Sequence, residues 1–157
     1  MVMGAMFPIA TCVCRSENGD NWEWFLSCLR DIVYNSEDPF MPPEGLVFVS
    51  DRDKGLQSAV KECFPDSYHS YCIRHLLGNF KNNLTGLDAV VKQDCVNLMD
   101  SADYKYTEIK FIQVAFKLEK KSKQAFELMM NMEPNHWANY FFLGRRFNMC
   151  VYLCIFD

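Results

Sequence analysis

The first half of the chain alternates short apolar runs with segments of helical periodicity. Nearly continuous apolar runs at residues 6–14 and 46–50 predict two short strands, each buried on both faces. Apolar residues recur every three or four positions over 21–34 and 53–63, which predicts two amphipathic helices. A third short strand is expected at 67–71. This alternation of strands and helices is typical of an α/β fold.

Polar and breaking residues set the expected ends of these elements. Asp20 is expected to be the N-cap of the first helix, with Glu23 completing a capping box. Residues 35–45 contain three prolines and are expected to form a loop. Pro65 is expected to end the second helix. The boundaries therefore follow from a few local signals.

The second half of the chain is predicted to be helical. A helix is expected from Cys72 to about Leu84, and Gly78 weakens it without breaking it. Helical periodicity continues over 87–98 and 104–132, and the aromatic segment 136–143 is expected to be a short helix. The core candidates of this half are Phe111, Val114, Ala115, Leu118, Ala125, Phe126, Met129 and Met130. The expected organisation is an α/β part over 1–85, a helical part over 86–149 and a divergent tail over 150–157.

Composition narrows the class of protein. The chain has 157 residues, of which 50% are hydrophobic and 15% aromatic, so a single globular core is expected. The net charge of −4 excludes a chain-wide basic field for nucleic acid. Local basic candidates are Lys117–Lys123 and Arg145–Arg146, although such a run on a helix also fits a solvated face.

The cysteines and the lengths of the apolar runs argue against a secreted, disulfide-bonded protein and against a membrane protein. Eight cysteines in a chain of this length would be consistent with disulfide bonds. No secretory signal is visible at the start of the sequence, so free thiols in a reducing compartment are expected. Four of them, Cys12, Cys14, Cys150 and Cys154, sit in apolar runs, where a thiol behaves as a small hydrophobe. No apolar run is long enough to span a bilayer, so no membrane partner is expected.

Asp51 is the strongest candidate for chemistry. It follows the apolar run 46–50, and a carboxylate at the carboxyl end of a buried strand sits at the usual ligand edge of an open α/β sheet. Mg²⁺ prefers such oxygens, and phosphodiester chemistry with two ions needs two or three carboxylates from different elements. The alternative is that Asp51 caps the helix that follows.

Cys72 and His75 form a second candidate. Their spacing places both side chains on the same helical face, where they could share one zinc ion or one substrate phosphate. Cys63 and His69 lie close enough in sequence to supply further zinc ligands, but the spacing matches no common zinc finger. The alternative for His75 is a structural role at the start of a helix.

Four ordered segments carry a family resemblance. They are Phe7-Pro-Ile-Ala, then Glu17-Asn-Gly-Asp-Asn-Trp-Glu-Trp-Phe-Leu, then Val49-Ser-Asp-Arg-Asp-Lys-Gly-Leu, then Cys63-Phe-Pro-Asp-Ser-Tyr-His-Ser-Tyr-Cys-Ile-Arg-His-Leu. Together they resemble the catalytic core of plant Mutator-like element transposases, over about residues 4–149. Transcription factors of the far-red-impaired-response type share this core, so the resemblance does not separate an enzyme from a regulator.

The resemblance implies a ribonuclease-H-like fold with three metal-binding acids, Mg²⁺ or Mn²⁺ as cofactor, DNA as partner and a nuclear location. Asp51 matches the second acid, and Cys72 with His75 matches the Cys-x-x-His element of the family. The first acid would precede Phe7-Pro-Ile-Ala, and the third would follow Arg146-Phe-Asn-Met. Neither matches a residue here, and Glu127 and Glu133 lie outside the motif, so they are assigned to a solvated helix face.

The sequence therefore favours a partial ribonuclease-H-like fold with its first strands missing and a helical C-terminal region. We expect a transposase-core fragment, truncated at both ends, that does not cleave DNA. An exposed edge of the strand at 6–14 would then favour self-association. The alternatives are a transposase-derived nuclear regulator and an active metal-dependent transposase.

Overall fold

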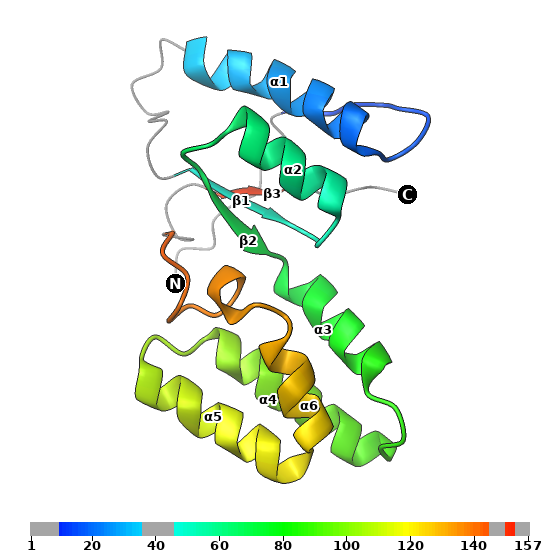
Figure 1. Ribbon diagram of the computed structural model, residues 1–157, viewed down its shortest axis with the longest axis vertical. Helices are drawn as coiled ribbons and strands as arrows, with labels where there is room; N and C mark the ends of the chain where they lie inside the picture. Colours follow the sequence, from blue (N-terminus) through cyan, green and yellow to red (C-terminus); the bar gives the residue numbers. More distant parts are fainter. Residues whose placement is uncertain (1–9, 36–45, 145–149, 153–157) are drawn as a thin grey trace. The chain divides into compact units, whose positions relative to one another are not determined.

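The computed structural model describes residues 10–35, 46–144 and 150–152, and over these it is a mixed α/β structure that is mostly helical (Figure 1). The chain divides into two compact units. The first comprises 1–44 and 53–67, and the second comprises 45–52 and 68–157. In chain order the elements are α1 (Gly19–Asn35), β1 (Val47–Ser50), α2 (Lys54–Cys63), β2 (Tyr68–Tyr71), α3 (Ile73–Asn83), α4 (Ala89–Asp103), α5 (Glu108–Lys121), α6 (Lys123–Met130), the 3-10 turn η1 (Pro134–His136) and β3 (Cys150–Tyr152).

The first unit is a pair of packed helices, α1 and α2. The predicted inward face of α2 is confirmed, because Leu56, Ala59, Val60 and Cys63 are all buried. Residue Asn18, and not Asp20, caps α1: its side-chain oxygen accepts a hydrogen bond from the Asn21 N–H at 2.9 Å. The helix begins at Gly19, so Asp20 already lies in its first turn.

Gly19 and Gly55 let the two helices of this unit approach closely. A Cβ atom added at Gly55 would lie 2.9 Å from the Gly19 Cα atom and 3.0 Å from its N atom. Both neighbours are backbone atoms and cannot rotate away. The contact therefore requires glycine at 55.

Gly55→Ala is expected to lower the free energy of unfolding by about 1–3 kcal/mol, because the added methyl group forces the helices apart. Gly78→Ala is the matched control in α3, where an added Cβ meets nothing within 4 Å. It should raise stability by about 0.5–1 kcal/mol, because alanine has the higher helix propensity. Urea unfolding of both variants measures the difference, and equal shifts of the same sign would contradict the packing at Gly55.

The second unit contains a parallel sheet with the strand order β2-β1-β3. Ser50 pairs with Tyr71 across β1 and β2, and Val47 pairs with Cys150 across β1 and β3. β1 is the central strand of the described sheet, and all four of its residues are buried. This burial on both faces is what the continuous apolar run 46–50 predicts.

The helices of the second unit share one apolar core. Its larger buried members come from α3, α4, α5, α6 and the segment after them: Leu76, Phe80, Cys95, Met99, Phe111, Leu118, Met129 and Trp137. Six of the eight core candidates from the sequence are buried, whereas Phe126 is partly buried and Met130 is 41% exposed. The predicted helical C-terminal half is therefore confirmed in outline.

Two predicted elements are wrong in the described residues. Residues 10–14 form no strand, and Val13 is 97% exposed; residues 6–9 lie outside the description. An apolar run shows that burial is favourable but does not supply a neighbouring strand for its N–H and C=O groups. The expected helix at 136–143 does not form: only His136, the last residue of η1, belongs to a 3-10 turn, and irregular turns follow it. The expected edge for self-association at 6–14 is thus absent over 10–14.

The helical periodicity over 104–132 corresponds to two helices, which are separated at Ser122. The Ser122 backbone is extended, with φ −159° and ψ 114°, and its side chain accepts from the Ala125 N–H at 3.1 Å. A serine that bonds the backbone in this way competes with helix continuation and starts a new helix. α5 and α6 are therefore separate helices.

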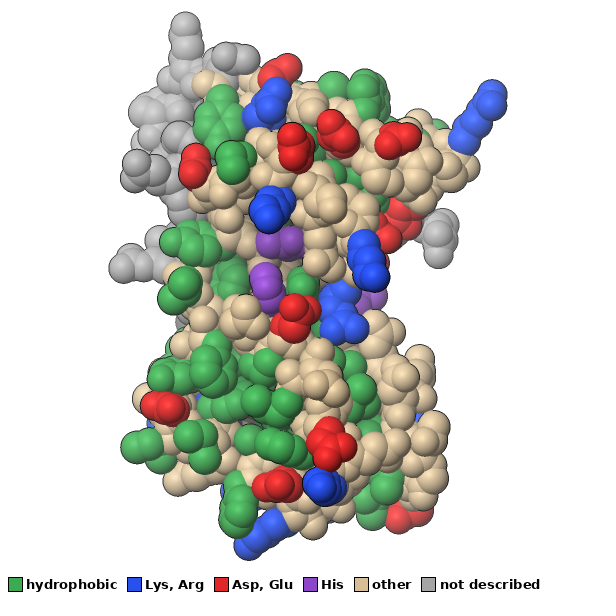
Figure 2. Space-filling model, viewed as in Figure 1, with side chains coloured by type: hydrophobic (Ala, Val, Ile, Leu, Met, Phe, Trp, Pro, Cys, Tyr) green, Lys and Arg blue, Asp and Glu red, His purple; other side chains and the backbone are tan. Residues whose placement is uncertain are grey.

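Large hydrophobic side chains are also exposed in the second unit. On the face shown in Figure 2, hydrophobic side chains gather over the lower helices, where α5 lies. The exposed members on α5 are Ile109, Ile112 and Phe116, which are 70%, 55% and 53% exposed. Among the described residues, no helix combines the length and the hydropathy needed to cross a membrane.

Candidate functional site at the carboxyl ends of the parallel strands

Asp51 directly follows the central strand β1 and is half-buried. Asp51 does not cap the helix that follows it. The N-cap of α2 is Asp53, whose side chain accepts a hydrogen bond from the Leu56 N–H at 2.8 Å. Asp51 therefore stands where the sequence placed it, at the end of a buried strand. This is the edge at which open α/β sheets bind ligands.

Cys72 follows the neighbouring strand β2, one register step beyond the pair formed by Ser50 and Tyr71. The Cys72 N–H donates to the Ser50 carbonyl oxygen at 2.6 Å, which holds the ends of the two strands together. The structure thus brings Asp51 and Cys72 to the same edge of the sheet. Their roles in chemistry stay predictions.

His75 lies in the first turn of α3, for which Cys72 is the N-cap. Its side chain is exposed, whereas that of Cys72 is half-buried. The Cys72 side chain accepts no hydrogen bond from the N-terminal N–H groups of α3. The Cys-x-x-His element is therefore the start of a helix at the strand-end edge.

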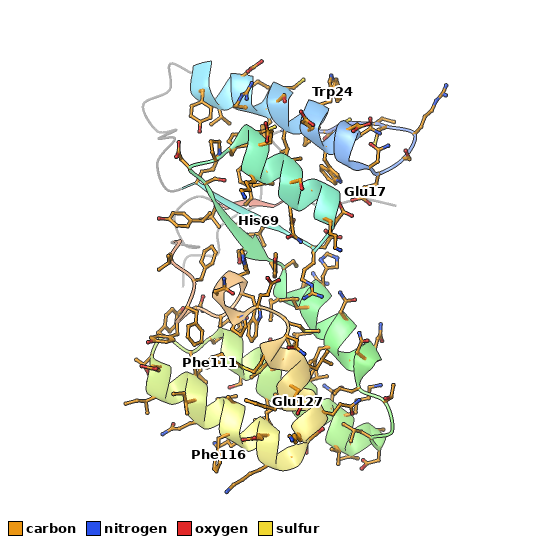
Figure 3. All side chains as sticks on the ribbon, viewed as in Figure 1. Glu17, Trp24, His69, Phe111, Phe116 and Glu127 are labelled. Atoms are coloured by element: carbon orange, nitrogen blue, oxygen red, sulfur yellow. The ribbon has the colours of Figure 1, made fainter. Side chains whose placement is uncertain are left out.

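His69 is a residue of this edge that sequence reasoning considered only as a zinc ligand. Its Nε2 atom lies 2.7 Å from Ser50 Oγ, and Ser50 Oγ donates to the Asp51 carbonyl oxygen at 2.8 Å. Figure 3 labels His69 on β2. The imidazole thus fixes the last residue of β1 and, through it, the backbone of Asp51.

Burial lowers the pKa of His69 from 6.5 to about 4, and the nearby His136 adds to the effect, while Asp51 opposes it. The ring is therefore neutral at neutral pH. Because the Ser50 hydroxyl gives its one proton to the Asp51 carbonyl oxygen, the Nε2–H group of the neutral imidazole is the donor to Ser50 Oγ.

A second set of contacts joins β2 to the segment after α6. His136 Nδ1 lies 3.0 Å from the His69 carbonyl oxygen, and the His136 carbonyl oxygen accepts from Ser70 Oγ at 2.9 Å. The rings of Tyr71 and His136 stack with centroids 4.6 Å apart. No local signal marks these partners, which are 66 and 67 positions apart in the chain.

Glu133 corrects an expectation from the sequence. It is not on a helix face: it follows α6 in the left-handed region, with φ 56°. Its carboxylate accepts from the Tyr71 hydroxyl at 3.1 Å, and burial followed by this carboxylate raises the pKa of Tyr71 to about 12. Glu127 does lie on an exposed helix face, where it pairs with Lys123 at 3.7 Å.

The described donors do not form a complete metal site. No group of three or more His, Cys, Asp or Glu side chains that could hold an ion occurs within 10–35, 46–144 and 150–152. Cys63, which lies close enough in sequence to have supplied a further zinc ligand, is buried within the first unit, and its thiol donates to the Glu23 carbonyl oxygen at 3.6 Å. The described residues therefore supply neither the carboxylates of a two-ion clamp nor the four ligands of a structural zinc site.

A comparison with protein families finds a match that covers the residues of this edge. The family model of the MULE transposase domain matches residues 2–79, which include Asp51, Cys72 and His75. An alignment of 94 positions, which covers 56% of the chain, shows 31% identity to the PKS-NRPS hybrid synthetase cheA of Chaetomium globosum. The chain spans 2% of the length of that synthetase. No solved structure matches the chain.

Proposed function

We propose that the chain is a segment of a Mutator-like transposase core, because residues 2–79 match the family model of the MULE transposase domain, and that it binds DNA at the carboxyl ends of β1 and β2. The observation that carries the proposal is the position of Asp51 at the end of the central parallel strand, beside Cys72 at the end of its neighbour. We also propose that the sheet belongs to a ribonuclease-H-like fold and that the protein acts in the nucleus.

The charges at this edge suit a phosphate backbone. Arg52 follows Asp51 directly, and Arg74 and His75 lie in the first turn of α3; all three side chains are exposed. The N-terminus of α3 points its N–H groups and the positive end of its dipole at whatever lies before it, which favours an anion. Two arginines and a helix N-terminus can therefore hold phosphates next to Asp51.

We propose further that these 157 residues do not cleave DNA by themselves. Two-ion phosphoryl transfer needs two or three carboxylates clamped around the ions, and Asp51 is the one carboxylate here that matches the motif of the family. The Glu133 carboxylate accepts a hydrogen bond from Tyr71 and lies outside that motif. Binding without cleavage is equally what a transposase-derived regulator would show, and this is the second candidate.

Reversing the charges at the proposed DNA edge tests the binding. The double variant Arg52→Glu/Arg74→Glu is expected to weaken binding of a short DNA duplex about tenfold or more at low salt, because two phosphate contacts are replaced by repulsion. Fluorescence anisotropy of a labelled duplex measures the affinity, and the salt dependence of the affinity should become shallower.

Lys110→Glu/Lys117→Glu is the matched control, because it makes the same charge change on exposed lysines of α5. Its affinity for the duplex should stay within about twofold of the unsubstituted chain, apart from the long-range effect of net charge. Equal losses in the two double variants would contradict a DNA site at the strand-end edge.

A further inference from the structure

The helix α5 is apolar on two opposite faces. Its inward face is buried in the core of the second unit through Phe111, Val114, Ala115 and Leu118. Its outward row is Ile109, Ile112 and Phe116, spaced i, i+3 and i+7, and each of these side chains is more than half exposed. Figure 3 shows Phe116 projecting from α5 away from α4 and α6. The outward row has the spacing of a helix-docking face.

The two edges of the outward row differ in charge. At 100° per residue, Lys110, Lys117 and Lys120 fall on one side of the row, and Glu108 and Glu119 fall on the other. Lys120 Nζ also lies 4.4 Å from the centroid of the Phe116 ring. A helix laid along this row would meet a basic edge and an acidic edge.

The chemistry of the row is a poor fit to nucleic acid. Isoleucine has no π face on which a base can stack, and a phosphate placed over Ile109 and Ile112 would lose its water without gaining a donor. Downstream in the same lysine run, Lys121 pairs with Asp94 and Lys123 pairs with Glu127. The basic stretch Lys117–Lys123 is therefore partly neutralised by acidic residues.

We propose that the outward row of α5 is a docking site for an amphipathic helix of a partner protein. The partner helix carries apolar residues at three- and four-residue spacing, acidic residues along the edge that meets Lys117 and Lys120, and basic residues along the edge that meets Glu108 and Glu119. Apolar burial supplies the affinity, and the lysine edge selects the partner and its orientation.

Two synthetic helical peptides test this in the full 157-residue chain. Both carry leucine at i, i+3 and i+7; the first has glutamates along one edge, and the second has lysines at the same places. Fluorescence anisotropy should show at least about tenfold tighter binding of the glutamate peptide. Ile112→Ser should weaken that binding about tenfold, whereas Val90→Ser, which changes a 72% exposed side chain on α4, should leave it unchanged.

The ratio of the affinities for the two peptides tests the lysine edge independently of the apolar row. Lys117→Glu should reduce the advantage of the glutamate peptide, and circular dichroism checks that each variant keeps its helix content. Equal binding of the two peptides, or binding of neither, would overturn the proposal. So would DNA binding, or a concentration-dependent dimer in sedimentation, that Ile112→Ser abolishes, because each would assign the row to another occupant.

Discussion

Trp137→Ala is expected to lower the free energy of unfolding by about 3–5 kcal/mol, the largest stability change of any single substitution considered. The Trp137 side chain is fully buried, and its indole N–H donates to the Met132 carbonyl oxygen at 2.9 Å. Truncation leaves a large cavity beside Phe111 and removes the donor from a buried carbonyl. This loss is a large fraction of the free energy of unfolding of a typical domain, which is about 5–15 kcal/mol.

Trp24→Ala is the matched control, because Trp24 is 61% exposed on α1. Its effect on unfolding should be within about 0.5 kcal/mol. Urea unfolding followed by circular dichroism compares the two variants without relying on tryptophan fluorescence. Similar midpoints for Trp24→Ala and Trp137→Ala would contradict the core assigned to the second unit.

The stability of the protein is expected to fall as the pH drops from about 6.5 to about 4, because His69 is held neutral in the folded state. The unfolded chain takes up a proton on this ring near pH 6.5, whereas the folded chain resists it down to about pH 4. Between these values the unfolded state binds more protons, so acid favours it. Above pH 6.5 both states are neutral at this ring and the contribution is constant. The expected loss from this residue is about 3 kcal/mol.

His69→Gln should flatten this part of the pH profile, because glutamine can still bond Ser50 but does not titrate. His75→Gln is the matched control, because it changes an exposed imidazole on α3. Denaturant unfolding between pH 4 and 7.5 gives the slopes. If His69→Gln keeps the slope of the unsubstituted chain while His75→Gln removes it, the burial of His69 is wrong.

The elements around the candidate site could be predicted because local signals agree there. The apolar run before Asp51 predicts that β1 is a buried strand. Asp53 and Pro65 mark the two ends of α2 to within a residue or two. The position of Asp51 at a strand end needs nothing beyond this periodicity. Ser122 also carried a usable signal, since a serine within a helical pattern is a candidate N-cap.

The contacts that hold the edge together could not be predicted from local signals. His69 meets Ser50 because β1 and β2 are parallel and in a particular register, and His136 meets β2 from the far end of the helical half. Residues 10–14 show the converse case, in which a strong apolar signal finds no strand partner among the described residues. Register and pairing are properties of the folded chain and not of any window along it.

The proposed DNA-binding edge holds Asp51 without a complete set of metal-binding carboxylates among the described residues. Incubation of the purified chain with supercoiled plasmid and Mg²⁺ or Mn²⁺ tests it most directly, with Asp51→Asn and the exposed-site control Asp66→Asn alongside. None of the three proteins is expected to nick the plasmid above background. Metal-dependent nicking that Asp51→Asn abolishes and Asp66→Asn preserves would contradict it.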